Sequence, residues 1–356
     1  MSRLAAAADE GTLTHALLLT GPDSVGKTTA ALALGERLLD SASWPGGPGA
    51  HPDLWLEDSA AENISIKRVK PGGDEGPTLQ DFLGLRPYAG GRRVAIIGRA
   101  DRLGIEAANN LLKTIEEPPP ATHLVLCAAH PEKLPQTVVS RCEMFVLAPV
   151  PAAGIVDWLS GEHGVDAERA AMAASVAAGR PGRALRLATE PGALDSELAA
   201  LDAFLAAGGG GVAGAIRAAD EVAPGPGAEG RERALLTLAA WASFVRDAAC
   251  FAAGAPELAL WSRYRPALER WAQDLSAARI VAILHRLVVA SESVAAYAQP
   301  RLAFEALMLD VFGVPDSPPP VDPVPRGRVA AISAPERAGT SHRRRAAPRG
   351  RSRDGG

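Results

Sequence analysis

Residues 21–28 have the sequence GPDSVGKT, which matches the pattern G-x-x-x-x-G-K-[ST]. The residues just before them, 16–19, are apolar and predict a buried strand, while residues 28–39 carry leucines at helical spacing. A strand, a glycine loop and a helix start bind anions well, because backbone N–H groups and the helix dipole face the phosphate. Gly21 and Gly26 permit the positive φ that such a loop needs. The stretch predicts a nucleotide-binding loop; the alternative is a chance strand–loop–helix that holds no nucleotide.

The motif also predicts which residues contact the nucleotide. Lys27 would reach the β- and γ-phosphates, and Thr28 would offer its hydroxyl to Mg²⁺. ATP with Mg²⁺ is therefore the cofactor that this loop suggests. The predicted binding residues are Gly21, Ser24, Val25, Gly26, Lys27, Thr28 and Thr29.

A second apolar run, residues 94–97, lacks the acids that nucleotide hydrolysis requires. An ATPase with this kind of loop carries two acids after such a strand, one for the Mg²⁺ shell and one that polarises water. Here Gly98 and Arg99 follow the strand, and Asp101 lies too late to substitute without a change of register. Arg99 is either an ordinary surface arginine or a residue that occupies the emptied metal site.

The first 150 residues alternate between strand and helix patterns. Further strands are predicted at 124–127 and 145–147, and helices at 79–85 and 105–115. Residues 64–69 suggest a short strand or turn, 44–52 and 71–77 suggest loops, and 1–11 leave little structure ahead of the first strand. This alternation predicts an α/β fold with a parallel sheet wrapped by helices and a ligand at the carboxyl ends of the strands.

The rest of the chain is helical by pattern. Residues 152–188 suggest short helices, and from 194 onward Trp241, Phe244, Trp261 and Trp271 suggest an all-α core. Beyond residue 316 the composition shifts to Pro, Arg, Ser and Gly, which predicts disorder. We therefore expect a P-loop core at 1–149, a small helical lid at 150–192, a helical collar at 193–315 and a disordered basic tail at 316–356.

Composition indicates a soluble, cytoplasmic protein. Hydrophobic residues make up 47% and charged residues 22% of the chain, and the net charge is −4. Residues 317–356 hold nine Arg and three acids, a local balance of +6. No 18-residue apolar run and no signal-peptide pattern are present. The three cysteines, Cys127, Cys142 and Cys250, provide neither a disulfide framework nor a C-x-x-C metal site.

Two long stretches resemble a known family. They are LRPYAGGRRVAIIGRADRL at 85–103 and AANNLLKTIEEPPPATHLVLCAAHPEKLPQTVVSRC at 107–142. The order and spacing of NLLKTIEEPP, HPEKLPQT and SRC are similar to those of the bacterial DNA polymerase III clamp loader, an AAA+ family. The resemblance covers residues 16 to about 187 and is closer to the delta-prime branch than to the tau/gamma motor branch. It implies an AAA+ core, a small lid and a collar that holds a pentamer together.

The resemblance assigns roles to two arginines. Arg141 matches the arginine of the family's SRC motif, which implies a finger directed at the ATP of a neighbouring motor subunit; a salt-bridged surface arginine is the alternative. Arg183 matches the lid arginine called sensor 2, which implies contact with this subunit's own nucleotide; a surface charge at a helix start is the alternative.

The chain departs from the family's motor pattern in four places. Gly98-Arg99 replace the acidic pair, and Ala128-Ala129 stand where a polar sensor residue is expected. The four-cysteine zinc module ahead of HPDL is absent, so we expect no zinc. The adenine-wrapping N-terminal segment is reduced to about ten residues. These departures argue against hydrolysis, the intact loop argues for nucleotide binding, and whether the loop holds nucleotide stays open.

The predicted function is that of a clamp-loader stator without ATPase activity of its own, part of a DNA polymerase holoenzyme. By resemblance its partners are the tau/gamma motor and delta subunits, the sliding clamp and primed DNA in the cytoplasmic, nucleoid-associated replisome, with no membrane. The alternative is an active tau/gamma-like AAA+ ATPase motor, against which Gly98, Arg99 and the lack of a long tail argue. A small-molecule P-loop kinase explains neither SRC nor the helical C-terminal part.

Overall fold

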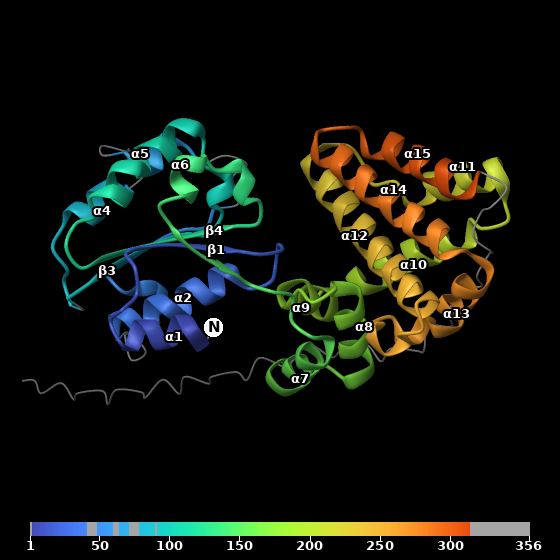
Figure 1. Ribbon diagram of the computed structural model, residues 1–356, viewed down its shortest axis with the longest axis horizontal. Coiled ribbons are helices and arrows are strands. Elements are labelled where there is room, and N and C mark those ends of the chain that lie inside the picture. Colours follow the sequence, from blue (N-terminus) through green and yellow to red (C-terminus); the bar gives the residue numbers. More distant parts are fainter. Residues whose placement is uncertain (1, 41–47, 60–63, 71–77, 90, 314–356) are drawn as a thin grey trace, which may run out of the picture. The chain divides into compact units, whose positions relative to one another are not determined.

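Five parallel strands form the sheet around which the first 150 residues are arranged (Figure 1). The structure is a computed structural model, and it describes residues 2–40, 48–59, 64–70, 78–89 and 91–313. The strands lie in the order β2-β3-β4-β1-β5. They are β1 (Ala16–Thr20), β2 (Leu54–Glu57), β3 (Arg93–Ile97), β4 (Thr122–Ala128) and β5 (Glu143–Val146). The predicted α/β fold with a parallel sheet followed by helices is confirmed.

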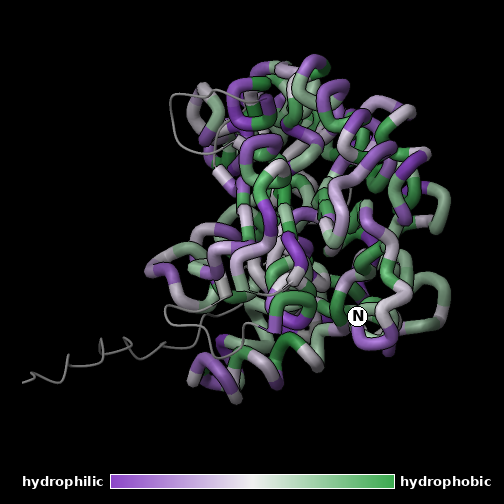
Figure 2. Tube along the Cα trace, turned by 90° about the vertical axis from the view of Figure 1, so that its left-hand side faces the viewer, coloured by the Kyte–Doolittle hydropathy of each residue, from purple (hydrophilic) through white to green (hydrophobic). Residues whose placement is uncertain are grey.

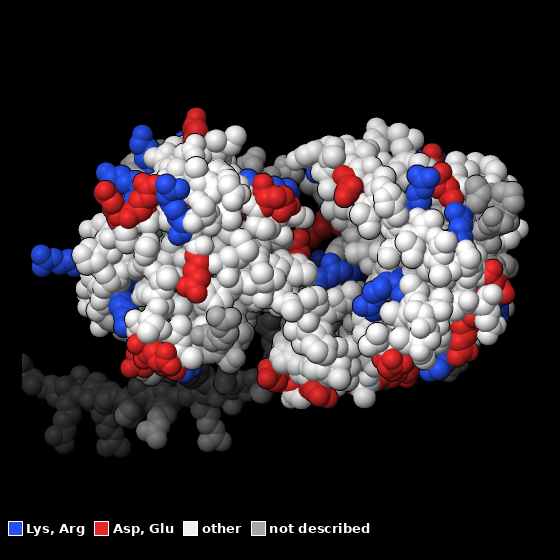
Figure 3. Space-filling model, viewed as in Figure 1, with Lys and Arg blue, Asp and Glu red and all other residues white. Residues whose placement is uncertain are grey.

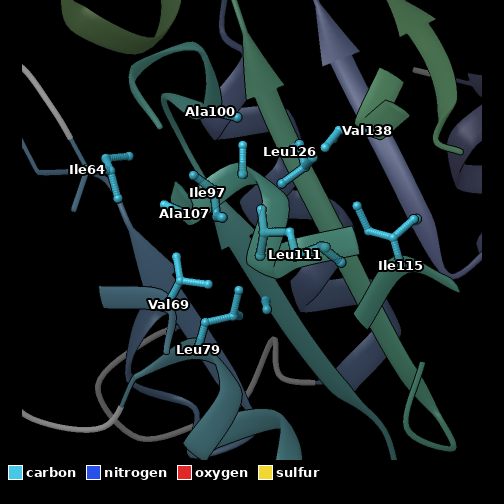
Figure 4. Packing of buried hydrophobic residues seen from close by; sticks show 14 of the residues in the cluster. Ile64, Val69, Leu79, Ile97, Ala100, Ala107, Leu111, Ile115, Leu126 and Val138 are labelled. Carbon is cyan, nitrogen blue, oxygen red and sulfur yellow. The ribbon is translucent and has the colours of Figure 1, made fainter. Parts of the chain in front are cut away.

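Helices cover both faces of this sheet. One face is covered by α1 (Ser2–Asp9) and α2 (Lys27–Leu39), and the other by α3 (Ile66–Val69), α4 (Leu79–Gly84), α5 (Ile105–Glu116) and α6 (Gln136–Val139) (Figure 1). Figure 4 shows the second face, where Ile97 and Leu126 of the strands meet Leu111 and Ile115 of α5. Because both faces are covered, the middle residues of the central strands are apolar and buried, whereas β3 begins with Arg93 and β4 with Thr122 and His123.

Several helices begin at residues that are typical of helix N-termini. Thr78 and Asp81 form a capping box at the start of α4, where each satisfies a backbone N–H of the other. Pro181 stands in the first turn of α9 (Pro181–Thr189) and Pro300 in the first turn of α15 (Pro300–Phe312), where a missing N–H costs no helical hydrogen bond.

Three sequence predictions in this region are corrected by the structure. Residues 1–11 were expected to have little structure, but Ser2–Asp9 form α1, which packs Leu4 and Ala8 into the core and pairs Asp9 with Arg37. Residues 64–69 contain helix α3, preceded by a single bridge between Ile64 and Leu103. Strand β2 was not predicted, because LWLE is short and ends in a charged residue.

Some predicted segments lie outside the described residues. The loop predicted at 44–52 is described only from residue 48, where Pro48–Ala50 form a short 3₁₀ turn. The loop at 71–77, Gly90 and the basic tail at 316–356 fall outside the description.

The remainder of the described chain is helical. The first group comprises α7 (Ala152–His163), α8 (Ala167–Ala177) and α9 (Pro181–Thr189). The second group comprises α10 (Ala193–Ala206), α11 (Gly211–Val222), α12 (Gly227–Ala252), α13 (Arg265–Asp274), α14 (Ala277–Ala295) and α15 (Pro300–Phe312). The described residues also contain short 3₁₀ turns. Those among the strands are Pro48–Ala50, Ala100–Arg102 and Pro131–Lys133, and those between α12 and α13 are Pro256–Leu258 and Ser262–Tyr264.

An aromatic core holds the second helical group together, as the tryptophans and phenylalanines of the sequence suggest. Phe204 of α10 stacks on Trp241 of α12 with ring centroids 4.5 Å apart. Trp271 of α13 and Phe312 of α15 complete the contacts around Phe204. Each ring of this size buries about 150–250 Å² of surface, so a few of them stabilise a helical core strongly.

Helix α12 is long and apolar enough to cross a membrane by length and composition alone. However, half of its most apolar window is buried inside the protein, and Arg246 and Asp247 interrupt the apolar sequence. Asp247 is fully buried and accepts hydrogen bonds from the backbone N–H groups of Leu260 and Trp261. These contacts are those of a core helix.

The surface is mixed in polarity and charge. Along the trace in Figure 2 hydrophilic and hydrophobic residues alternate every few positions, as helices with one buried side require. On the face shown in Figure 3, basic and acidic residues are interspersed, so this face presents no broad basic area to nucleic acid.

Asp53, of the HPDL segment, is a buried charge that joins the β2–β3 edge to the loop after α4. It is 0% exposed, accepts hydrogen bonds from the N–H groups of Tyr88 and Ala89, both at 2.7 Å, and lies 3.5 Å from Arg93. Arg93 in turn donates to the carbonyls of Phe82 and Arg86. The pair therefore fixes the loop that leads into β3.

We predict that Asp53→Ala lowers the free energy of unfolding by about 3–5 kcal/mol, because it leaves Arg93 buried without its carboxylate. Urea denaturation followed by circular dichroism measures this loss. The exposed Asp157→Ala on α7 serves as the control and should change stability by less than about 0.5 kcal/mol. A loss below about 1 kcal/mol for Asp53→Ala would contradict this account of the pair.

Candidate functional site

The predicted phosphate-binding loop joins the carboxyl end of β1 to the start of α2. Gly21 has φ 141° and lies against the carbonyl of Leu147, so a side chain there would collide with backbone. Gly26 has φ 102° and precedes the first residue of α2. Both glycines are required by the conformation of the loop.

Lys27 is buried in this loop, with 8% of its surface exposed. Its Nζ donates to the carbonyls of Gly21 and Pro22, both at 2.8 Å, and lies 4.0 Å from Asp23. Burial lowers the pKa of Lys27, although nearby Asp23 and Asp101 act in the opposite direction. The structure therefore places an ammonium group inside the loop, as phosphate binding requires.

The other predicted binding residues surround the same loop. Ser24 and Thr29 are exposed, Thr28 is half-buried, and Val25 is buried with its N–H donating to the carbonyl of Pro22 at 3.3 Å. The glycines, the ammonium and the helix start fit a nucleotide's phosphates. Which of these residues contact a nucleotide stays a prediction.

The side of the loop where a metal would bind is unusual. Gly98, at the end of β3, leaves space that the carboxylate of Asp58 fills: a Cβ on residue 98 would collide with that carboxylate and would lie 3.1 Å from Thr28 Oγ1. Arg99 is 42% exposed, and its Nε lies 3.8 Å from Asp58 Oδ1. Burial raises the pKa of Asp58, and the charge of Arg99 partly offsets this. The acid missing from β3 is thus replaced in space by an acid that follows β2.

Sequence reasoning missed Asp58. The residue comes directly after β2, and the carboxyl ends of β1, β2 and β3 meet at one edge because the strands are parallel. The position of Asp58 at this edge follows from the sequence only if LWLE, residues 54–57, is recognised as a strand.

Asp101 has a different position. Its Oδ2 accepts hydrogen bonds from the N–H groups of Ala129 and His130, at 3.1 and 3.0 Å. It therefore connects the turn after β3 to the turn after β4, where the sensor residue was expected.

Arg183, the predicted lid arginine, contacts residues of other helices, and among the described residues no hydrogen bond or ion pair joins it to the phosphate-binding loop. It is 2% exposed, donates to the carbonyl of Leu236 at 3.0 Å and lies 3.4 Å from Glu197. Burial lowers the pKa of Arg183 to about 10, with Glu197 acting in the opposite direction. These partners belong to α10 and α12, and a nucleotide contact by Arg183 stays a prediction.

Arg180, three residues earlier, precedes the first residue of α9, and its Nε donates to the carbonyl of Ala177 at 3.0 Å. The N–H of Gly182 donates to the carbonyl of Ser24 at 3.0 Å, which places the start of α9 against the loop. The charge of Asp23 acts on Arg180, whose pKa burial lowers. Sequence reasoning chose Arg183 from its place in the GRPGR motif and overlooked Arg180.

Arg141 lies between α6 and β5, at the other end of the sheet. Its Nε is 2.7 Å from Glu116 Oε1 at the end of α5, and its Nη1 donates to the carbonyl of Thr137 at 3.1 Å. Because β1 and β5 are parallel, the loop follows the carboxyl end of β1 while Arg141 precedes the amino end of β5. Strand β5 alone separates the two levels by on the order of 13 Å, at about 3.3 Å a residue.

Comparison with known proteins shows what the first half of the chain is similar to. Residues 1–151 match the family model described as DNA polymerase III, delta subunit. Over 201 residues the chain is 32% identical to the DNA polymerase III subunit delta′ of Escherichia coli (strain K12), covering 52% of this chain and 58% of that protein. Over about half of its length the chain is therefore similar to DNA polymerase III delta-prime clamp-loader proteins.

The chain is also similar to a tau subunit and to a solved gamma-related structure. It is 30% identical to the subunit tau of Bacillus subtilis (strain 168) over 153 residues, 40% of this chain and 26% of that protein. A crystal structure of a gamma subunit-related protein from Thermotoga maritima aligns with 86% of this chain and 97% of that chain, with a TM-score of 0.44 and 18% identity. The chain spans a little over half the length of the delta-prime relative.

Cys142, which follows Arg141 in the SRC motif, is a poor nucleophile. Burial raises its pKa to about 11, and the pKa of Cys127 in β4 to about 12. Both thiols are therefore protonated at neutral pH, and only the thiolate reacts readily.

We expect iodoacetamide to modify Cys142 on the order of 100-fold more slowly than a free thiol at pH 7.5, because its thiolate fraction is lower by about that factor. Mass spectrometry of digests taken over time measures the rate, with glutathione as the reference. In urea the same cysteine should react at the reference rate. A native rate equal to that of glutathione would show that burial does not suppress this thiolate.

Proposed function

We propose that this chain is the delta-prime stator subunit of a cytoplasmic DNA polymerase III clamp loader. In that role it would hold the ring together with tau/gamma motor and delta subunits and help load a sliding clamp onto primed DNA. Arg141 would act as a finger that stabilises the charge developing on the γ-phosphate of a neighbouring motor subunit. The predicted domains, 1–149, 150–192 and 193–315, would serve as AAA+ core, lid and collar.

The position of Arg141 supports the finger most directly. Its guanidinium is 42% exposed and lies at the end of the sheet opposite the chain's own phosphate-binding loop. An arginine in that place cannot reach its own nucleotide, so a phosphate that it contacts belongs to another subunit. Arginine fingers supplied in trans raise the rate by on the order of 10³–10⁵-fold in well-studied cases.

The surroundings of the chain's own loop support a non-hydrolysing role. Arg99 occupies the position from which an acid would polarise the attacking water, and a guanidinium cannot act as a base at neutral pH. Ala128 and Ala129 offer no side-chain hydrogen bond to a γ-phosphate or a water. Both features leave the loop without the groups that activate water.

The carboxylate of Glu116 pairs with the guanidinium of Arg141 and would have to be replaced by the phosphate of a neighbouring subunit. The Arg141–Glu116 pair is exposed on both sides, at 42% and 49%. Exposed pairs contribute about 0–1 kcal/mol, so exchanging Glu116 for a phosphate costs little. The same pair also supports the ordinary alternative, in which Arg141 only stabilises the fold.

The proposal predicts that Arg141→Ala lowers ATP turnover at the neighbouring motor site by on the order of 10³-fold, because the γ-phosphate loses its trans cation. Turnover is measured on the loader reconstituted with motor subunits, delta, clamp and primed DNA, after size-exclusion chromatography shows intact assembly. The chain alone should release no phosphate. Phosphate release by the chain alone that disappears in Lys27→Ala would show an active motor instead.

Glu116→Gln is the matched control for this experiment. It breaks the same ion pair but keeps the guanidinium, so we expect less than about a 5-fold change in turnover, in line with the small contribution of an exposed pair. If Glu116→Gln reduces turnover as much as Arg141→Ala does, the ion pair acts structurally and the finger is refuted.

A further inference from the structure

Two oxygen atoms approach the same point at the carboxyl edge of the sheet, and among the described residues neither accepts a hydrogen bond from the protein. They are Asp58 Oδ1, just after β2, and Thr28 Oγ1, in the first turn of α2. Both lie around the point where a side chain on Gly98 would begin. Within the described residues, the recorded partner of the Asp58 carboxylate is Arg99, at 3.8 Å, beyond hydrogen-bond distance.

Gly98 makes this arrangement possible. Any larger residue at that position would displace the Asp58 carboxylate, because its Cβ would occupy the same space. Gly98 therefore has two effects: it stands where β3 would otherwise carry an acid, and its lack of a side chain leaves room for Asp58, which follows β2. The two strands are hydrogen-bonded neighbours, with Glu57 opposite Ile97, so Asp58 and Gly98 are next in register.

The chemistry of these atoms is that of a magnesium site. Mg²⁺ binds hard oxygen ligands, and in nucleotide sites it takes one or two protein carboxylates or hydroxyls together with phosphate oxygens and waters. Thr28 and Asp58 supply a hydroxyl and a carboxylate next to the loop that holds Lys27. The donor set therefore fits Mg²⁺ bound with a nucleotide.

We infer that Asp58 supplies from β2 the metal-binding carboxylate that β3 lacks, so that this chain binds a nucleoside triphosphate together with Mg²⁺. Arg99 moves off Asp58 when the metal binds, since the pair is long and Arg99 is partly exposed. Binding is not followed by hydrolysis, because no acid stands where water would be polarised. The chain then carries a resident Mg²⁺–nucleotide.

This inference goes beyond the proposed stator role and is tested separately from it. Nucleotide binding is measured on the full chain alone, without motor subunits and without Arg141 taking part. A negative result for Arg141 in the reconstituted loader would not contradict the proposed metal site. A negative result for nucleotide binding would not contradict the role proposed for Arg141.

The experiment is isothermal titration of the chain with ATP, in EDTA and in MgCl₂, for wild type, Asp58→Asn and Asp40→Asn. Asp40 lies at the far end of α2, so the same substitution there is the matched control. We expect Mg²⁺ to raise the affinity of wild type and Asp40→Asn by at least roughly 10-fold, since loss of a metal-site group costs 10–100-fold. Asp58→Asn should lose that gain and keep its affinity in EDTA, because the loop itself is unchanged.

A direct readout of the metal accompanies the titration. Mn²⁺ bound with ATP should give a protein-dependent electron paramagnetic resonance spectrum in wild type that is absent in Asp58→Asn. Matching melting temperatures of the nucleotide-free variants exclude a folding defect. The inference is overturned if wild type binds no ATP, if its affinity is the same with and without Mg²⁺, or if Asp58→Asn keeps the Mg²⁺ gain. Arg99→Ala should retain the gain; loss of ATP binding in EDTA by this variant would show that Arg99 replaces the metal.

Discussion

The parallel pairing of all five strands is the constraint on which the rest of this structure depends. Parallel strands place all their carboxyl ends at one edge, so the loop after β1, Asp58 after β2, Gly98 after β3 and the turn after β4 become neighbours. The same pairing sends the start of β5 to the opposite edge. One geometric rule thus separates the edge that carries the phosphate-binding loop from the edge that carries Arg141.

Three aspartates accept hydrogen bonds from backbone N–H groups of loops and turns. Asp53 accepts from two loop N–H groups, Asp101 from two turn N–H groups and Asp247 from two N–H groups between α12 and α13. A carboxylate that accepts several backbone hydrogen bonds fixes the segment that donates them. Asp53 and Asp101 therefore fix loops next to strands of the sheet, and Asp247 fixes the segment that follows α12.

Local sequence signals were enough to predict most of the sheet but not the whole site. The strand, loop and helix around Gly21 and the helix at Ile105–Glu116 were predicted because apolar spacing and glycine chemistry act within a few residues. Strand β2 and helix α1 were missed, since LWLE is too short to show a period and alanine-rich SRLAAAAD depends on packing against α2. Asp58 and Arg180 were missed for a related reason: each acquires its place from the pairing of segments distant in sequence.

Strand β5 connects the segment that holds Arg141 to the residue that packs against the phosphate-binding loop. At one end, the residue after the strand rests its carbonyl against Gly21 while its N–H bonds to Thr20, and at the other end Arg141 precedes the first strand residue. A hydrogen-bonded strand is stiff along its length, so we expect a shift of the loop backbone to move the arginine as well. The phosphate-binding loop and Arg141, at opposite edges of the sheet, are thus mechanically coupled through a single short strand.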